Sequence, residues 1–250
     1  MILSVSQLTK NFGGLRAVNK VDLAIAPATI HSIIGPNGAG KTTLFNLITG
    51  SIKPVDGSVR FRDRDITGWS PQRLAKLGVA RTFQRTSIYA RLDVLENVAL
   101  AIRSREGMTT SVWQPASAER RVRDEATDIL AKVGLRGREA VLAGNLAHGY
   151  QRSLDIAIGL ALNPALILMD EPLAGMSRGD RETVASLITM LRDTLGLTVV
   201  VVEHDVGMVM RLSDRITVMQ HGTVIADAPP AEIRGNEAVR NAYLHGNFAQ

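Results

Sequence analysis

The sequence has 250 residues, of which 45% are hydrophobic and 21% are charged, so it can form a sizeable core. The absence of cysteine excludes disulfides and thiolate chemistry, which suits a reducing compartment. The net charge of +5 suits a protein that binds an anion such as nucleic acid, anionic lipid or a nucleotide. Aromatic residues, at 4%, are too few to form a surface on which nucleic-acid bases stack.

No segment of the sequence is long and apolar enough to span a bilayer, and the N-terminal residues lack the basic start and apolar stretch of a secretion signal. We therefore expect a soluble, cytoplasmic protein that reaches a membrane only through a partner. A modest cluster of positive charge at Arg120, Arg121 and Arg123 is more typical of a solvated helix face than of a nucleic-acid surface.

Short strands separated by turns are predicted in the first sixty residues. Alternating apolar or β-branched residues mark the segments 2–8, 18–23 and 58–61. Turn-forming residues separate these segments at Gly13-Gly14 and over 54–57, where the sequence is Pro-Val-Asp-Gly. The N-terminal part is therefore predicted to be mainly β-structure.

A phosphate-loop pattern, G-x-x-x-x-G-K-[ST], follows the apolar segment 30–34 and precedes a helix-like segment at 42–49. It is matched by Gly35, Pro36, Asn37, Gly38, Ala39, Gly40, Lys41 and Thr42. The glycines let the backbone wrap so that its N–H groups point at phosphate oxygens, and the next helix favours the same anion. Lys41 can reach the β- and γ-phosphates, and the Thr42 hydroxyl can ligate Mg²⁺. A glycine-rich turn that matches by chance is the alternative, but strand, loop and helix occur in the right order.

The middle third is predicted to be helical over the segments 93–103, 118–133 and 150–162. A polar segment, 106–115, joins the first two helices. The third helix carries one apolar stripe that would face a core, made of Leu154, Ala157, Ile158, Ala161 and Leu162. We expect this part of the chain to be an inserted helical subdomain.

Strands and helices alternate in the last third. Strands are predicted over the segments 165–169, 197–202, 214–219 and 223–226. The turn His221-Gly222 splits the last two strands. A helix over 182–195 has an apolar face made of Val184, Leu187, Ile188, Leu191 and Leu195. This alternation predicts an α/β core with a largely parallel sheet, which binds phosphate at the carboxyl ends of its strands.

Two carboxylates, Asp170 and Glu171, follow the apolar strand that is predicted over 165–169. Asp170 at the end of a buried strand would hold Mg²⁺, through water. Glu171 would lie beside the γ-phosphate, where a carboxylate can polarise the attacking water. A helix-capping Asp-Glu pair is the alternative, and the presence of the phosphate loop in the same chain favours the catalytic interpretation.

His204 emerges at the end of the strand predicted over 197–202, and Gln84 ends another short predicted strand, 79–84. The His204 imidazole could hydrogen-bond the γ-phosphate and the attacking water. Gln84 could ligate Mg²⁺ and sense the γ-phosphate. A single histidine at a strand end is more often structural, and a single glutamine more often lies in a solvated loop. Both assignments therefore depend on the presence of the phosphate loop, Asp170 and Glu171 in the same chain.

Taken together, these motifs resemble the ATP-binding subunits of ATP-binding-cassette (ABC) transporters, over essentially the whole chain. GPNGAGKTT is similar to the Walker A motif and LILMDEP to the Walker B motif, while Gln84 resembles the Q-loop and His204 the switch histidine. The resemblance adds Thr43 to the nucleotide-binding residues. It also assigns to Phe12 the aromatic that stacks on adenine, with a core phenylalanine as the alternative.

The fold that this resemblance implies is an α/β P-loop NTPase core with a mainly parallel sheet and an N-terminal antiparallel β subdomain. An α-helical subdomain would be inserted at about 88–163 of a single ATPase domain spanning 1–250. The resemblance also implies that the protein binds ATP and Mg²⁺ and is an ATPase.

Three segments are similar to the cassette subunits of branched-chain amino-acid uptake systems and their urea and amide relatives: ARTFQ, DEPLAGM and AEIRGNEAVRNAYLHG. This similarity implies a peripheral protein at the cytoplasmic face of the inner (plasma) membrane, which energises import of a small polar solute. The implied partners are two membrane permeases, a sister ATP-binding subunit (as a heterodimer, or a second copy as a homodimer) and a periplasmic or extracellular solute-binding protein, without nucleic acid.

The family's signature motif, usually Leu-Ser-Gly-Gly-Gln, is altered in this sequence. The corresponding nucleotide-binding residues are Leu146, Ala147, His148 and Gly149. Ala147 lacks the serine hydroxyl that would bond the γ-phosphate on the partner subunit, a loss of roughly 1.5–3 kcal/mol. Ser177 replaces the aspartate that crosses the dimer interface, and Tyr150 replaces the signature glutamine. We therefore expect a homodimer to hydrolyse ATP slowly, and a heterodimer to keep one complete site.

Two other functions remain open at this point. A soluble ABC ATPase that acts on nucleic acid or ribosomes is supported only by the basic charge, and the second cassette or long coiled coil that is usual in such proteins is missing. A regulatory nucleotide-binding module without turnover is disfavoured by Glu171 and His204. The sequence does not identify the solute, because a cassette does not contact it.

Overall fold

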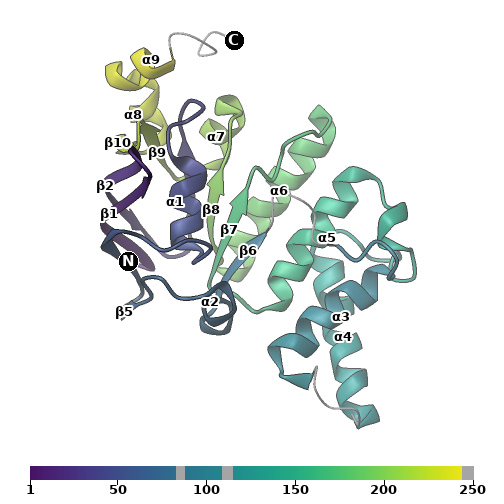
Figure 1. Ribbon diagram of the computed structural model, residues 1–250. Helices are drawn as coiled ribbons and strands as arrows, with labels where there is room; N and C mark the ends of the chain where they lie inside the picture. The colour runs from purple at the N-terminus through teal and green to yellow at the C-terminus, as the bar shows by residue number, and fades with distance from the viewer. Residues whose placement is uncertain (83–87, 109–114, 244–250) are drawn as a thin grey trace.

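Two β-sheets lie on either side of helix α1 (Lys41–Ile48) in this computed structural model, which describes residues 1–82, 88–108 and 115–243 (Figure 1). The sequence pattern predicted most of the remaining strands and about half of the remaining helices. The strands are β1 (Leu3–Phe12), β2 (Leu15–Ile25), β3 (Ile30–Ile34), β4 (Asp56–Phe61), β5 (Arg64–Asp65), β6 (Val79–Thr82), β7 (Leu166–Asp170), β8 (Thr198–Val202), β9 (Arg215–Gln220) and β10 (Thr223–Ala228). The other helices are α2 (Pro71–Leu77), α3 (Val94–Arg105), α4 (Ala116–Lys132), α5 (His148–Ala161), α6 (Arg178–Leu195), α7 (Val206–Leu212), α8 (Pro230–Gly235) and α9 (Glu237–Tyr243), with one 3-10 turn at Ala143–Asn145.

The larger sheet has the strand order β10-β9-β3-β8-β7-β6, and all neighbours except β9 and β10 are parallel. Val202 lies opposite both Ile33 and Asp170, so β3, β7 and β8 end at nearly the same level. The loops that follow these strands therefore leave the sheet at one edge. This confirms the predicted parallel core and places the phosphate loop beside the segments that carry Glu171 and His204.

The smaller sheet is antiparallel, with the order β2-β1-β4-β5, and it confirms the N-terminal β subdomain. One turn was predicted wrongly: Asp56 and Gly57 belong to β4 instead of the turn at 54–57. A Cβ on Gly57 would lie 2.4 Å from the Gln7 carbonyl oxygen, and the glycine has φ 87°. Gly57 therefore allows β4 to approach β1 where the pairing register shifts.

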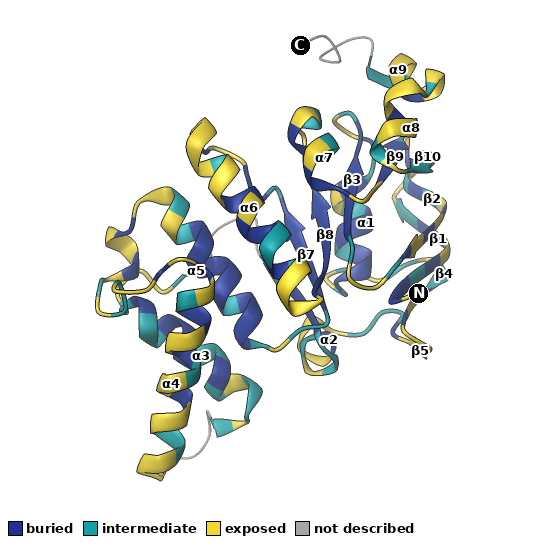
Figure 2. Cartoon of the chain, turned by 180° about the vertical axis from the view of Figure 1, so that it is seen from behind, coloured by how far each residue is buried: buried dark blue, intermediate teal, exposed yellow. Residues whose placement is uncertain are grey.

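The apolar core lies on both faces of the larger sheet. On one face, α1 packs between the two sheets, and Phe45 of α1 and Phe61 of β4 are fully buried. On the other face, a second apolar cluster joins the sheet to α3, α4, α5 and α6. Figure 2 shows the buried residues along the central strands and the exposed residues on the outer faces of α4 and α6. Each fully buried large side chain contributes about 1.5–3 kcal/mol to folding.

Helices α3, α4 and α5 pack together at one end of the molecule (Figure 1). The Asp93 side chain begins α3 by accepting a hydrogen bond from the Glu96 N–H at 2.6 Å. α5 was predicted to have one apolar stripe, but Arg152, Ser153 and Asp155 are buried as well, because α5 also contacts α6 and β6. The subdomain limits at about 88 and 163 stay a prediction.

Helix α6 begins earlier than the predicted residue 182, because Ser177 is its N-cap and accepts a hydrogen bond from the Asp180 N–H. The predicted apolar face is buried at Val184, Ile188 and Leu191, but Leu195 at the helix end is 47% exposed. Among the described helices, including α6, we find none that combines the length and the apolar character needed to cross a membrane.

Candidate active site

The phosphate loop connects β3 to α1, and its backbone lies against two distant strands. A Cβ on Gly35 would lie 2.2 Å from the Met219 carbonyl oxygen of β9, and a Cβ on Gly40 would lie 2.3 Å from the Ala17 carbonyl oxygen of β2. Gly40 also has φ 98°. Glycine is therefore required at both positions, because any side chain would push the loop away from the strands that hold it.

Lys41 lies inside this loop, with only 5% of its surface exposed. Its Nζ donates hydrogen bonds to the carbonyl oxygens of Gly35 at 2.7 Å and Pro36 at 3.0 Å. Burial lowers the pKa of Lys41, and the charges of Glu171 and Asp170 oppose this shift. The ammonium group is thus held near the loop interior, where it can pair with phosphate oxygens.

A pocket opens in front of the loop, and most of the predicted nucleotide-binding residues line it. The predicted residues that line it are Phe12, Asn37, Gly38, Ala39, Gly40, Lys41, Thr42, Thr43, Glu171 and His204. Phe12 is 50% exposed, so the alternative that it is a core residue is wrong. An exposed aromatic ring at the edge of the pocket is available to stack on a base.

One wall of this pocket was not predicted from the sequence. It is made of Leu15, Arg16, Ala17, His221 and Gly222. The Gly222 N–H donates to the Ala39 carbonyl oxygen at 3.0 Å, and the Gly222 carbonyl oxygen accepts from the Asn19 N–H at 2.8 Å. The turn at 221–222 was predicted, but its contact with the phosphate loop depends on how the two sheets pack, which the sequence pattern does not show.

Tyr243 is another residue near the phosphate loop that was not predicted from the sequence. It lies at the end of α9 and packs against the apolar cluster that contains Ile34, the residue before the phosphate loop. Burial raises the pKa of the Tyr243 phenol, and a hydrogen bond from the Gly35 backbone partly offsets this rise. Because that bond lowers the pKa, the phenolic oxygen accepts it from the Gly35 N–H. α9 therefore contacts the first glycine of the loop.

Asp170 ends β7 and is buried, with 2% of its surface exposed. Its Oδ2 atom accepts no hydrogen bond within the described residues and lies 3.8 Å from Nη2 of Arg81. Burial raises the pKa of Asp170, and the charge of Arg81 opposes that rise. A buried carboxylate with an oxygen that accepts no hydrogen bond within the described residues fits the oxygen ligands that Mg²⁺ prefers.

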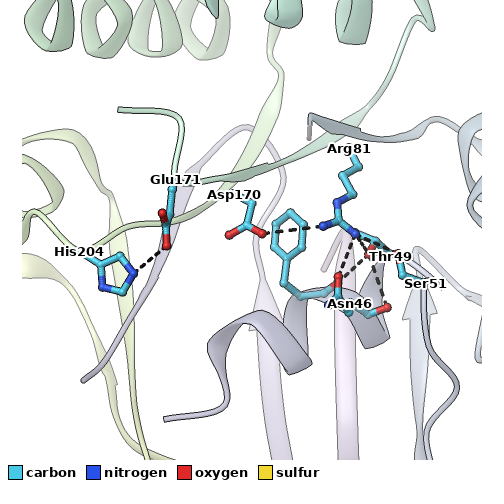
Figure 3. Close-up of polar contacts among 8 residues, drawn as sticks. Asn46, Thr49, Ser51, Arg81, Asp170, Glu171 and His204 are labelled. Carbon is cyan, nitrogen blue, oxygen red and sulfur yellow. Dashed lines mark hydrogen bonds and ion pairs between the residues drawn. The ribbon is translucent and has the colours of Figure 1, made fainter. Parts of the chain in front are cut away.

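Glu171 has a left-handed backbone, with φ 50°, which costs about 1–3 kcal/mol for a residue of this kind. Backbone contacts hold it there: its N–H donates to the Val202 carbonyl oxygen at 2.9 Å, and its carbonyl oxygen accepts from Arg152 at 3.0 Å. Its Oε1 lies 2.7 Å from Nε2 of His204 (Figure 3). The strained backbone thus directs the Glu171 carboxylate toward His204 and the pocket.

Glu203 holds the segments that carry Glu171 and His204 together through hydrogen bonds to their backbone, and this role was not predicted. Its carboxylate is buried and accepts hydrogen bonds from the N–H groups of Leu173 at 2.8 Å and His204 at 3.1 Å. Burial raises the pKa of Glu203, while these two bonds lower it. Glu203 therefore ties the loop after Glu171 to the start of the segment that carries His204.

The signature segment does not join this pocket. Leu146, Ala147, His148 and Gly149 are absent from the described pocket lining and lie at the start of α5. Ala147 is the N-cap of α5 and makes no side-chain capping bond, whereas the Ser177 hydroxyl donates to Asp180 at 2.7 Å within its own chain. The other predicted residue, Gln84, lies outside the described residues. Phe12, the phosphate loop, Asp170, Glu171 and His204 are therefore the predicted residues that the fold brings together.

Two family models match this sequence. The model described as "ABC transporter" matches residues 18–174, which include the phosphate loop, Asp170 and Glu171. The model described as "Branched-chain amino acid ATP-binding cassette transporter" matches residues 223–244, which include β10, α8 and α9. The first match alone covers more than half of the chain.

Known proteins resemble the chain over nearly its whole length. The high-affinity branched-chain amino acid transport ATP-binding protein LivG of Escherichia coli (strain K12) is 40% identical over 248 residues, 97% of each chain. BraF of Pseudomonas aeruginosa, a protein of the same description, is 38% identical over 250 residues, again 97% of each chain. The crystal structure of an ABC transporter's ATP-binding cassette in its ADP conformation has a TM-score of 0.85 and 30% identity, and the match covers 97% of this chain and 98% of that chain. The chain therefore belongs to the ABC transporter family as an ATP-binding cassette.

Proposed function

We propose that this chain hydrolyses ATP to drive the import of branched-chain amino acids, or of closely related amino acids and amides, through membrane permease partners. The strongest support is the pocket in front of the phosphate loop, because Lys41, Glu171 and His204 line it together and Oε1 of Glu171 lies 2.7 Å from Nε2 of His204. The most similar relatives reported above are named for branched-chain amino acid transport. They favour transport over the alternative of a soluble ATPase that acts on nucleic acid or ribosomes.

The phosphate loop and Lys41 bind the triphosphate in this proposal. Backbone N–H groups of the loop and the start of α1 surround the β-phosphate, and Lys41 exchanges its bonds to Gly35 and Pro36 for bonds to phosphate oxygens. Phe12 stacks on the base at the other end of the pocket. This set of contacts orients the γ-phosphate toward Glu171.

Glu171 and His204 carry out the proton chemistry. Water attacks the γ-phosphorus, the bond to the β-phosphate oxygen breaks, and Glu171 accepts the proton that the water loses. His204, at 2.7 Å from Glu171, fixes the carboxylate and donates to the γ-phosphate once nucleotide is bound. Positioning and charge neutralisation supply the rate enhancement, without a covalent intermediate.

Thr42, Asp170 and Gln84 are the residues proposed to hold Mg²⁺. The ion, when bound, neutralises charge on the β- and γ-phosphates. Thr42 lines the pocket, and Asp170 offers a buried carboxylate with an oxygen that accepts no hydrogen bond within the described residues. Gln84, outside the described residues, follows β6 and is proposed to sense the γ-phosphate.

A second cassette completes the site. Leu146, Ala147, His148 and Gly149 would face the nucleotide of the partner, and the partner's signature would close over this chain's phosphate loop. Because Ala147 lacks a hydroxyl, we propose a heterodimer with a sister subunit, in which this chain's phosphate loop forms the complete site. A homodimer would hydrolyse ATP slowly at both sites.

The cytoplasmic face of the inner membrane is the proposed location, since a transport cassette must contact permeases there. The support is the naming of the relatives as transport ATP-binding proteins. A periplasmic or extracellular solute-binding protein would deliver the solute, and two permeases would carry it. Specificity for the solute would lie in these partners.

The decisive experiment is transport by the assembled system. The chain would be reconstituted in proteoliposomes with its permeases, sister cassette and binding protein, and leucine uptake would be measured with ATP inside. We expect uptake, and we expect Glu171→Gln in this chain alone to reduce uptake and ATPase activity about 100-fold while ATP binding persists. Normal ATPase activity in the Glu171→Gln assembly would contradict the proposal.

A further inference from the structure

Arg81, at the carboxyl end of β6, anchors its guanidinium on the last turn of α1. Its Nη1 donates to Oδ1 of Asn46 at 2.9 Å, to Oγ1 of Thr49 at 3.2 Å and to Oγ of Ser51 at 2.9 Å (Figure 3). Thr49 is the C-cap of α1, and the Arg81 side chain is only 19% exposed. Three acceptors on one side fix the plane of the guanidinium, which a flexible ammonium group would not achieve.

The other side of the same guanidinium faces the candidate magnesium carboxylate. Nη2 of Arg81 lies 3.8 Å from Oδ2 of Asp170, and the guanidinium carbon lies 4.7 Å from the ring centre of Phe45 in α1. Figure 3 shows Asp170 between Arg81 on one side and the pair of Glu171 and His204 on the other. Arg81 therefore connects the helix that follows the phosphate loop to the end of β7.

We propose that Arg81 is a positioning residue of the nucleotide site, which holds the Asp170 carboxylate in one orientation by tying it to α1. The inference rests on the proposed role of Asp170 toward Mg²⁺. With Oδ2 attracted to a fixed guanidinium, the second oxygen stays directed to the side of Glu171 (Figure 3). Without Arg81, the buried carboxylate loses the cation on its α1 side and turns about its Cα–Cβ bond.

The test is the effect of Mg²⁺ on ADP affinity, measured by calorimetry in EDTA and in excess Mg²⁺. ADP is used because it is not hydrolysed, so the readout is independent of catalysis. We expect Arg81→Met to bind ADP in EDTA like the unmodified chain. The Mg²⁺ gain, which is the ratio of ADP affinity in excess Mg²⁺ to ADP affinity in EDTA, should be about ten-fold smaller in this variant. Arg81→Lys keeps the charge without the fixed fork, so it should lose part of that gain.

Arg73→Met is the matched control. The Arg73 guanidinium also stacks on an aromatic ring, with 3.6 Å to the Trp69 ring centre, but on α2 instead of beside Asp170. It should leave the Mg²⁺ gain unchanged. Ser51→Ala removes one exposed anchor of Arg81 and should reduce the gain slightly, in the direction of Arg81→Met.

Three outcomes overturn the inference. A full Mg²⁺ gain in Arg81→Met would reduce Arg81 to a packing role, even if the melting temperature falls. If Arg81→Met does not fold, a full gain in Arg81→Lys has the same meaning. If the unmodified chain itself gains no ADP affinity from Mg²⁺, the proposed magnesium role of Asp170 fails first, and the role of Arg81 fails with it.

Discussion

The phosphate loop and the signature segment, which a dimer would bring to one nucleotide, are held in place in different ways. The phosphate loop is fixed by distant strands, since Gly35 lies against Met219 and Gly40 against Ala17. The signature segment is the start of one helix, and its N-cap residue Ala147 makes no side-chain capping bond. The phosphate loop is thus enclosed by the backbone of distant strands. The signature segment is held by side-chain contacts instead, because Leu146 is buried in the apolar cluster of the helices and Gly149 lies against Asp180 of α6.

Removing the positive charge of Lys41 from the phosphate loop should give the largest loss of ATPase activity. Lys41→Met deletes the ammonium that donates to Gly35 and Pro36, so the loop loses the cation that would pair with phosphate. ATPase activity should fall at least about 100-fold, and ATP binding should weaken with it, as fluorescence of a labelled nucleotide would report. Lys132→Met, an exposed change in α4, is the control. Unchanged activity in Lys41→Met would refute the assignment of the loop.

Restoring the family serine at position 147 of the signature segment should raise the ATPase rate. Ala147→Ser supplies the hydroxyl that would bond the γ-phosphate of the partner site, and roughly 1.5–3 kcal/mol corresponds to about ten-fold or more in rate. The ATPase rate of a homodimer should therefore rise about ten-fold. Serine is also a better N-cap, so the melting temperature should rise. A rise in melting temperature without a rise in ATPase rate would show that the signature departure does not limit hydrolysis.

The contact of α9 with the loop should have a moderate effect. Tyr243→Phe removes the acceptor of the Gly35 N–H bond while it keeps the packing against the cluster of Ile34. A single hydrogen bond is worth about 0.5–1.5 kcal/mol, so ADP affinity should fall about two- to ten-fold. Tyr89→Phe, at a residue that is 62% exposed, should leave affinity unchanged. Equal affinities in the two variants would mean that α9 does not support the loop.

The smallest effect concerns stability and pH. Because burial raises the pKa of Asp170, its ionised form destabilises the nucleotide-free fold at neutral pH, and this penalty is lost as pH falls through the raised pKa. Asp170→Asn should therefore raise the melting temperature at pH 7 by about 2–4 °C. The advantage should shrink toward about pH 4. Asp124→Asn, an exposed change in α4, should not show this pattern.

Local motifs were predictable because their chemistry depends on neighbours in the sequence. The phosphate loop follows a strand and begins a helix, and Asp170, Glu171 and His204 follow apolar strands, so parallel pairing was enough to bring them together. The helices α2, α7, α8 and α9 were not predicted. Three of them are only seven residues long and α8 has six, too short for a clear apolar period.

Contacts between distant elements were not predictable from one sequence. Arg81 looked like a polar residue in a short strand, and its bonds to α1 require the packing of β6 beside that helix. Glu203 directly follows the strand predicted over 197–202, but its bonds to Leu173 and His204 depend on the loop after β7. Leu195 fitted the apolar face of α6, yet the helix extends beyond the core there, so it remains exposed.

The bond between Tyr243 and Gly35 has a practical consequence for following nucleotide exchange. The sequence contains no cysteine, so a single cysteine introduced at the exposed Asn241 in α9 would be the only thiol available for dye attachment. A fluorophore there would sit two residues from Tyr243, on the helix that contacts the loop. Its emission would turn α9 into an optical reporter of phosphate-loop occupancy in the isolated subunit.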